Sequence, residues 1–165
     1  MWIELSGDQV ARAERVGSRR QEYNEGIAKP DAYGFTGDGR RAHVQGATAE
    51  LAVSLALGES WVEFSEDYEG LAADVGADLQ VRSTLHERGN LLLHPRDKDE
   101  QPFVLVRLHK APQVEICGWV LGRHGKHEQY WRDDGPFESR PCFLYPSRHL
   151  KSMESLAEQR GYKGI

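Results

Sequence analysis

Hydrophobic positions at helical spacing predict two long helices in the first third of the chain. The first is expected from a cap at Ser6 or Asp8 to about Ile27. Its core-facing residues would be Val10, Ala13, Val16, Tyr23 and Ile27. The second is expected from about Gln45 to Leu57, and Gly58 is its expected stop. Because this second helix is apolar nearly all round, we expect it to be buried.

Short apolar runs bounded by turn-forming residues predict strands. The expected strands are Trp2–Leu5, Trp61–Phe64, Leu71–Asp74, Asp78–Ser83, Asn90–His94, Phe103–Leu108, Val114–Leu121 and Cys142–Tyr145. The Phe103–Leu108 run is apolar enough to be a central strand. Polar loops are expected over 28–42, 95–102 and 122–139, and a last helix over about Leu150–Gln159. These elements predict an α/β or α+β domain built around one sheet.

Size and composition indicate a single globular domain over residues 1–165. The hydrophobic content of 39% and the charged content of 28% are ordinary for a soluble protein. No apolar run approaches ~20 residues, so neither a membrane span nor a secretory signal is expected. Cys117 and Cys142 form no CxxC pattern, which favours a reducing cytoplasm. The net charge of −5 argues against a protein that coats nucleic acid through bulk charge, but it leaves room for a nuclease.

The segment from Asp74 to Ser83 carries the strongest chemical pattern. Its sequence, Asp-Val-Gly-Ala-Asp-Leu-Gln-Val-Arg-Ser, predicts a strand end, a tight Val-Gly-Ala turn and a second strand. Because side chains two apart share one face of a strand, we expect Asp78, Gln80 and Arg82 on one side. Carboxylates, an amide and a guanidinium gathered in this way suggest a divalent cation and a phosphate.

Glu50 is the only ionisable residue in the apolar run Gly46–Leu57. A carboxylate buried there needs a charged partner, hydrogen bonds or a metal. One explanation is a salt bridge, for example to an arginine of the first helix. The other is a shared centre with Asp74 and Gln80, and the polar groups further along the chain favour it.

Two groups of arginines are candidates for contact with nucleic acid. Arg12, Arg15 and Arg19 recur on one face of the first helix, which would be either a solvated face or a stripe that contacts phosphates. Arg40 and Arg41 lie in the expected loop before the second helix. That loop would close over a ligand or would be an ordinary surface loop.

The order Glu50, Asp74, Gln80-Val81-Arg82 resembles the PD-(D/E)XK nuclease superfamily, in particular its small phage-type members. That pattern has a helical glutamate, an aspartate at a strand end and an acid-x-lysine strand. The resemblance covers about residues 43–121. It implies an α/β fold with a restriction-endonuclease-like core, in which helices flank a central mixed β-sheet. It also implies a crossover helix between the Gln80 and Phe103 strands, where the sequence has no clear helical pattern.

The resemblance further implies that water activated by Mg²⁺ or Mn²⁺ cleaves a DNA phosphodiester. Asp74 would bind the metal directly, and Gln80 would complete its shell. Glu50 would bind through water or a second metal, and Arg82 would stand beside the attacking water in place of the lysine. A homodimer would bring together the two sites that double-strand cutting needs.

Two residues depart from the pattern of this superfamily. Gln80 replaces an acid, and Arg82 replaces a lysine and stays protonated. We expect Asp78 to restore the missing charge as a further metal ligand. The alternative functions are a catalytically weak nuclease-like module of phage or defence type that binds DNA or a protein, and a structural protein whose buried acids are plain salt bridges.

A zinc site is a weaker hypothesis. His124 and His127, with Cys117 and Cys142, supply suitable donor atoms, but their spacing matches no familiar zinc pattern. Surface histidines are the favoured explanation.

Overall fold

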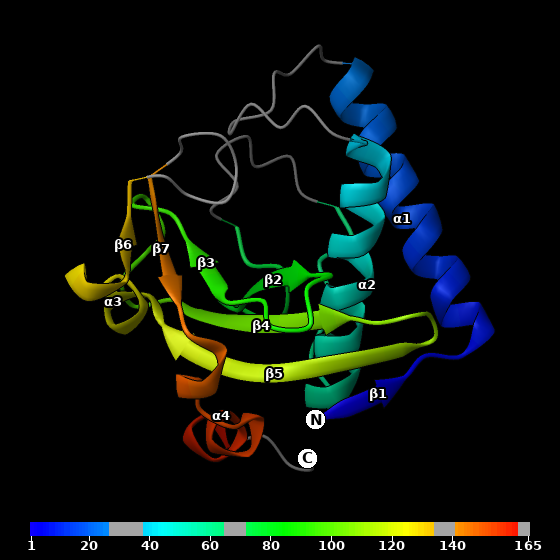
Figure 1. Cartoon of the computed structure of the whole chain (residues 1–165). Helices are drawn as coiled ribbons and strands as arrows, with labels where there is room; N and C mark the ends of the chain where they lie inside the picture. Colours follow the sequence, from blue (N-terminus) through cyan, green and yellow to red (C-terminus); the bar gives the residue numbers. More distant parts are fainter. Residues whose placement is uncertain (27–37, 65–71, 134–140, 162–165) are drawn as a thin grey trace.

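The computed structural model describes residues 1–26, 38–64, 72–133 and 141–161, and it has an α/β architecture with a mixed sheet (Figure 1). The helices are α1 (Gly7–Gly26), α2 (Gly39–Leu57), α3 (Gly122–Gly125) and α4 (Met153–Arg160), with 3-10 turns η1 (Glu128–Tyr130) and η2 (Ser147–His149). The strands are β1 (Trp2–Glu4), β2 (Gln80–Thr84), β3 (Leu91–Leu93), β4 (Pro102–Leu108), β5 (Gln113–Leu121), β6 (Trp131–Arg132) and β7 (Cys142–Tyr145). None of the helices in these ranges combines the length and the apolar character needed to cross a membrane.

The main sheet has four strands in the order β1-β5-β4-β2, and its only parallel pair among the described strands is β2 with β4. A parallel pair needs a crossover connection. Residues 85–101 make that connection through β3 and turns, without a helix, so the implied crossover helix is not present. A second, antiparallel sheet has the order β3-β7-β6.

Strand β4 is central to the main sheet, as its apolar sequence predicts, because it pairs with both β5 and β2. Its side chains alternate between two cores. Phe103 and Leu105 pack with Leu91 and Leu93 of the second-sheet strand β3, whereas Val104 and Val106 face the other core. The strand is therefore buried on both faces.

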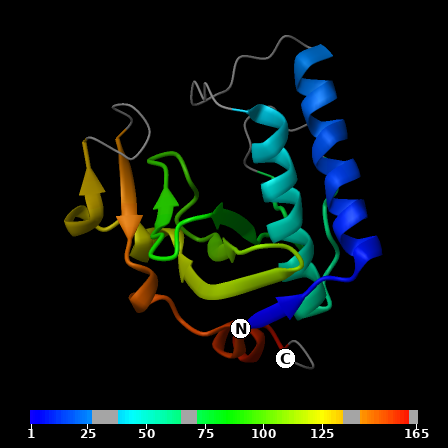
Figure 2. The ribbon, with the colours of Figure 1, turned by 45° about the vertical axis from the view of Figure 1, so that its right-hand side comes forward.

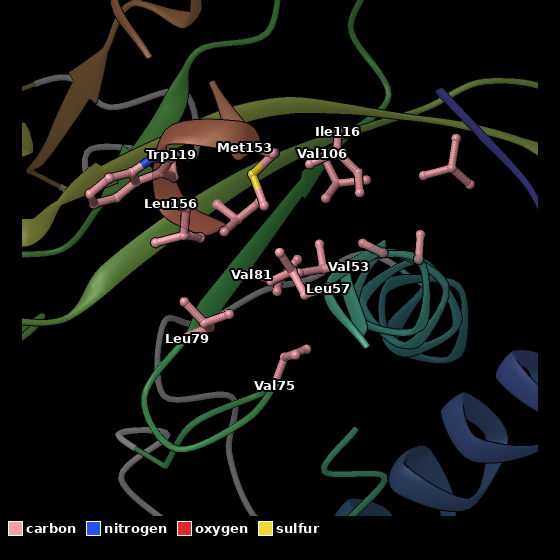
Figure 3. Packing of buried hydrophobic residues seen from close by; sticks show 14 of the residues in the cluster. Val53, Leu57, Val75, Leu79, Val81, Val106, Ile116, Trp119, Met153 and Leu156 are labelled. Carbon is pink, nitrogen blue, oxygen red and sulfur yellow. The ribbon is translucent and has the colours of Figure 1, made fainter. Parts of the chain in front are cut away.

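The larger core lies between α2, the main sheet and α4 (Figure 3). Val53 of α2 and Val81 of β2 pack toward the helix side, and Trp119 of β5 packs with Met153 and Leu156 of α4. The hydrophobic effect of this burial holds β2 against α2. That contact brings the strand with Gln80 and Arg82 next to the helix with Glu50.

Helix α1 packs along α2, on the side of α2 away from the second sheet (Figure 2). Ala13, Val16, Ala47 and Leu51 form the core between the two helices. Gly17 allows their backbones to approach closely, because a Cβ there would lie 2.5 Å from the Cα of Val44. Two long helices are therefore fixed side by side above the main sheet.

The start of α1 confirms the predicted cap. Ser6 Oγ accepts the Gln9 amide at 3.2 Å, and Gln9 Oε1 accepts the Ser6 amide at 2.7 Å, which is a reciprocal capping box. Gly58, with φ of 66°, ends α2 as expected. The predicted start of that helix at Gln45 is wrong, because Asp38 caps α2 by accepting the Arg41 amide at 3.1 Å. Asp38 and Gly39 therefore form the start of a helix and not part of a loop.

Three expected strands are shorter than predicted or absent from the described residues. Residues 61–64 make only an isolated bridge, between Trp61 and Val75, instead of a full strand. Strand β2 begins at Gln80, so Asp78 lies in the preceding turn. Residues 72–74 of the expected strand 71–74 form no strand or bridge, although the next residue, Val75, bridges to Trp61 and Leu79; Leu71 and Ile27 lie outside the described residues.

Candidate active site

A tight turn sets the position of Asp74. Val75 and Leu79 bridge across it, and Gly76 adopts a φ of 59°, which favours glycine. The backbone of Asp74 bonds on both sides, because its amide donates to Leu79 O at 2.8 Å and its carbonyl accepts the Val62 amide at 3.0 Å. Asp74 is therefore fixed between β2 and the segment 61–64.

The carboxylate of Asp74 accepts one hydrogen bond from the described residues. Its Oδ2 accepts the Val81 amide of β2 at 2.8 Å, and no group in the described ranges donates to Oδ1. Burial and the negative charge of Glu50 raise the pKa of Asp74 to about 7, against the opposing effects of Arg82, the Val81 amide and Arg20. A cation beside Oδ1 would stabilise the ionised carboxylate.

Glu50 is buried, at 6% exposure, and forms a salt bridge with an arginine of α1. Arg20 Nη1 donates to Oε1 at 2.9 Å and Nη2 donates to Oε2 at 2.7 Å. Trp61 Nε1 adds a third bond, to Oε2, at 2.9 Å. The salt-bridge explanation of Glu50 therefore holds, while its charge still acts on Asp74.

Arg20 was not among the predicted site residues. Besides its two bonds to Glu50, it donates to the carbonyls of Val62 at 2.9 Å and Glu63 at 2.8 Å. Burial alone would lower the pKa of Arg20. The hydrogen bonds to Glu50 and the charge of Glu50 raise this pKa by more, so the net pKa lies above its ordinary value. A sequence signal existed, because Arg20 lies four residues after buried Val16, on the core-facing side of the helix.

Gln80 and Arg82 lie on one face of β2, as the strand alternation predicts. Arg82 Nη1 donates to Gln80 Oε1 at 2.9 Å. Gln80 is buried, at 3% exposure, and its Nε2 donates to the backbone carbonyl of Ala72. Both the nitrogen and the oxygen of the Gln80 side-chain amide are therefore hydrogen-bonded, and the oxygen points to the Arg82 guanidinium.

Asp97 is a second residue that the sequence did not single out as part of the site. Its Oδ1 lies 3.3 Å from Arg82 Nη2, and its Oδ2 accepts the His94 amide at 2.8 Å. The Arg82 guanidinium also lies over the Phe103 ring, 5.3 Å from its centroid. Arg82 is therefore oriented by a carboxylate, an amide and an aromatic face.

Asp78 does not join this group. It lies in the turn before β2, and both of its oxygens pair with Arg160 of α4. The expectation that Asp78 shares the strand face of Gln80 is wrong, because the period-two rule does not extend into the turn. Its charge is already balanced by Arg160.

The predicted arginines of α1 are exposed or partnered at the surface. Arg12 pairs with Glu63 and lies over the Trp61 ring, at 5.2 Å from its centroid. Arg19 lies over the Phe64 ring at 5.3 Å, and Arg15 is exposed. Two of these three arginines therefore contact the segment that also carries the Trp61 bond to Glu50.

Arg40 and Arg41 lie in the first turn of α2, not in a loop as expected. Both are exposed, and Arg40 Nε donates to Ser18 Oγ of α1 at 3.1 Å. Because the helix fixes their backbone, a closing loop that carries these two arginines is excluded. Their side chains remain available on the surface beside α1.

The donor atoms around Asp74 suit a hard cation. Asp74 has a carboxylate oxygen to which no described residue donates, whereas the Gln80 amide oxygen already accepts from Arg82, and Mg²⁺ is commonly held by one or two carboxylates with water and substrate phosphate. Within the described ranges, no group of three or more His, Cys, Asp or Glu is arranged to hold a metal. The four-ligand zinc hypothesis with His124 and His127 therefore has no support in that part of the chain.

No model of a known protein family matches this chain, and no curated protein or solved structure matches it. Similarity to known proteins thus gives no family. The chemistry has to be argued from Asp74, Gln80, Arg82 and their neighbours.

Proposed function

We propose that this protein is a metal-dependent DNA nuclease of the PD-(D/E)XK type, which hydrolyses phosphodiesters with Mg²⁺ or Mn²⁺. The observation that carries the proposal is the carboxylate of Asp74, whose Oδ2 is bound to the strand that carries Gln80 and Arg82 and whose Oδ1 receives no hydrogen bond from the described residues. An oxygen without a donor, next to an oriented guanidinium, is suited to a cation and a phosphate.

The arrangement of the elements supports the same proposal. Helix α2 carries Glu50 and packs on β2, and Asp74 stands at the turn that leads into β2. Strand β2 is parallel to β4 in a mixed sheet, with α2 and α4 packed on one face of that sheet and β3 on the other. The order of helix, Asp74 turn and strand is the one that the superfamily resemblance implies, but the crossover helix is missing and the described helices α2 and α4 cover one face only.

Each residue has a defined role in the proposed reaction. A bound Mg²⁺ or Mn²⁺ would lower the pKa of water and neutralise charge on the phosphate. Asp74 would hold the ion through Oδ1, and the amide oxygen of Gln80, which accepts from Arg82, would complete the shell. Arg82 would donate to a phosphate oxygen and stabilise its developing charge, because a guanidinium remains protonated and cannot act as a base.

Exposed arginines supply the proposed contacts with the DNA backbone. Arg15 and Arg19 of α1, with Arg40 and Arg41 of α2, lie on two helices that pack side by side. Arginine contacts with phosphates position a protein on DNA without reading its sequence. A local basic surface of this kind is compatible with the net charge of −5.

The direct test is cleavage of linear, nicked and branched DNA by the full chain with Mg²⁺ or Mn²⁺. We expect cleavage that requires the metal, and we expect Asp74→Ala to abolish it. Asp99→Ala is the matched control, because the Asp99 carboxylate is at the surface, with 62% exposure, and pairs with Lys126. Full activity of Asp74→Ala would refute the role of Asp74.

A second candidate function is a nuclease-like module that binds DNA without cutting it. Gln80 favours it, because this neutral residue stands where the superfamily has an acid and its Nε2 is bound to Ala72 O. Arg82 favours it as well, because it cannot accept a proton. Salt-sensitive DNA binding by the wild type, without metal-dependent cleavage of any of the substrates, would select this function.

A further inference from the structure

The Glu50 carboxylate already has a cation. The Arg20 guanidinium faces both of its oxygens in a two-pronged ion pair, at 2.9 and 2.7 Å, and the Trp61 indole N–H donates to Oε2 at 2.9 Å. A paired guanidinium of this geometry satisfies a carboxylate in charge and in hydrogen bonding.

Arg20 is also anchored independently of Glu50. Its remaining contacts go to the carbonyls of Val62 and Glu63, and its side chain is only 19% exposed. If Arg20 moved away, these bonds would be lost and Glu50 would keep a buried charge without its ionic partner. The ion pair is therefore a fixed part of the site.

Of the other predicted metal ligands, Asp78 and Gln80 are already paired or uncharged, whereas Asp74 has no arginine bonded to it among the described residues. Asp78 is paired with Arg160, and Gln80 carries no charge. Asp74 has an oxygen to which no group of the described residues donates, and its other oxygen is bound only to a backbone amide. A divalent ion beside Glu50 would have to approach Arg20, and two cations on one carboxylate repel each other.

We propose that Arg20 stands in place of a second metal ion, so that the site takes a single divalent cation, held by Asp74. Glu50 is then a positioning residue that Arg20 holds, and not a metal ligand. This inference rests on the proposed metal-dependent function and defines its metal stoichiometry. With one protein carboxylate, the ion keeps most of its waters and is completed by a phosphate of the substrate.

The first test locates Mn²⁺ directly, in crystals of the full chain soaked at millimolar Mn²⁺. We expect one anomalous peak at coordination distance from Asp74, with the Arg20–Glu50 pair intact. Two peaks, or one peak that Glu50 also ligates, would overturn the single-ion inference and leave metal-dependent function standing. No peak at Asp74 would overturn both the inference and the function.

The second test measures Mn²⁺ affinity in solution and does not depend on DNA cleavage. The double variant Arg20→Gln/Glu50→Gln removes the ion pair without changing net charge, and the amide oxygen that it introduces at position 50 can still accept the Trp61 N–H. We expect its affinity to stay within about threefold of the wild type, whereas Asp74→Asn should lose at least about tenfold. A tenfold loss in a folded double variant would mean that Glu50 ligates the ion. If the double variant does not fold, the crystallographic result on the wild type decides.

Discussion

Asp97 Oδ1 lies 3.3 Å from Arg82 Nη2. This ion pair connects the turn before β4 to the face of β2 that carries Gln80. Asp97 is buried at 5% exposure. The PD-(D/E)XK pattern has an acid where this chain has Gln80. A negative charge is nevertheless present beside Arg82, because Asp97 supplies it from another part of the chain.

Asp97→Asn should loosen Arg82 while leaving the turn intact. The asparagine oxygen can still accept the His94 amide, but the charge-assisted bond to Arg82 is lost. We expect metal-dependent cleavage to fall about 10- to 100-fold, the usual consequence of a misplaced catalytic group. Single-turnover rates at saturating metal measure this loss.

Asp99→Asn is the matched control for this prediction. It removes a carboxylate two residues away that pairs with Lys126 at the surface and does not contact Arg82 in the structure. Its cleavage rate should stay within about twofold of the wild type, since surface pairs contribute little. Equal losses in the two variants would mean that Asp97 has no specific role at Arg82.

Asp74→Asn should change the pH dependence of stability. The folded state keeps the Asp74 proton up to a pKa of about 7, whereas the ordinary value is 3.8. Between these values the folded state binds more protons than the unfolded state, so this group makes stability fall as pH rises from about 4 to 7, with no further change above. Asp74→Asn has no carboxyl group to ionise, so its stability should not fall in this way. At pH 8 its free energy of unfolding, measured by urea denaturation, should exceed that of the wild type by on the order of 2 kcal/mol.

Convergence of the two stability curves as the pH falls to about 3 is the diagnostic feature of that experiment, because wild-type Asp74 is then mostly protonated in both states. Parallel curves from pH 4 to 8 would contradict the raised pKa. Mn²⁺ should stabilise the wild type increasingly as pH rises toward 7, because metal binding requires the ionised carboxylate. Asp74→Asn should show little Mn²⁺ stabilisation at any pH.

Gln80→Glu, which introduces the acid of the PD-(D/E)XK pattern, should destabilise this protein. The Gln80 Nε2 donates to Ala72 O, and a carboxylate oxygen in its place would face that carbonyl without a proton between them. We expect a loss of about 1–3 kcal/mol at neutral pH in the absence of metal. Mn²⁺ should recover more stability in this variant than in the wild type, because a second carboxylate strengthens the site.

Gln80→Met is a useful comparison, since it removes the same donor without adding charge. If Mn²⁺ stabilises Gln80→Glu no more than Gln80→Met, then position 80 does not face the metal. Cleavage gained by Gln80→Glu/Arg82→Lys, from an inactive wild type, would favour the binding-module function.

Local patterns predicted one part of the site. The pairing of Gln80 with Arg82 follows from strand alternation, and the Asp74 turn follows from its glycine. For Glu50 the sequence suggested an arginine of the first helix without saying which one, and for Asp78 it gave no partner, because these pairs form between distant parts of the chain. Arg20 pairs with Glu50 across 30 positions, and Arg160 pairs with Asp78 across 82 positions.

The fold shows the same limit. The central position of β4 follows from its apolar sequence, since only a strand covered on both faces can bury so many side chains. The start of α2 at Gly39 was missed because Gly-Asp-Gly is typical of loops, and the Asp38 cap is what makes it a helix start. The isolated bridge at Trp61 depends on Val75 and has no local signal of its own.

Arg15→Ala and Arg19→Ala should weaken DNA binding without affecting the fold. Arg15 is exposed, and Arg19 contacts only the face of the Phe64 ring among the interactions that the structure describes. Each lost phosphate contact should lower the slope of log affinity against log salt by about one. Arg148→Ala, at an exposed arginine of η2 and away from α1, is the control and should leave the slope unchanged. If all three variants bind alike at every salt concentration, the α1 arginines form a solvated face and the DNA lies elsewhere.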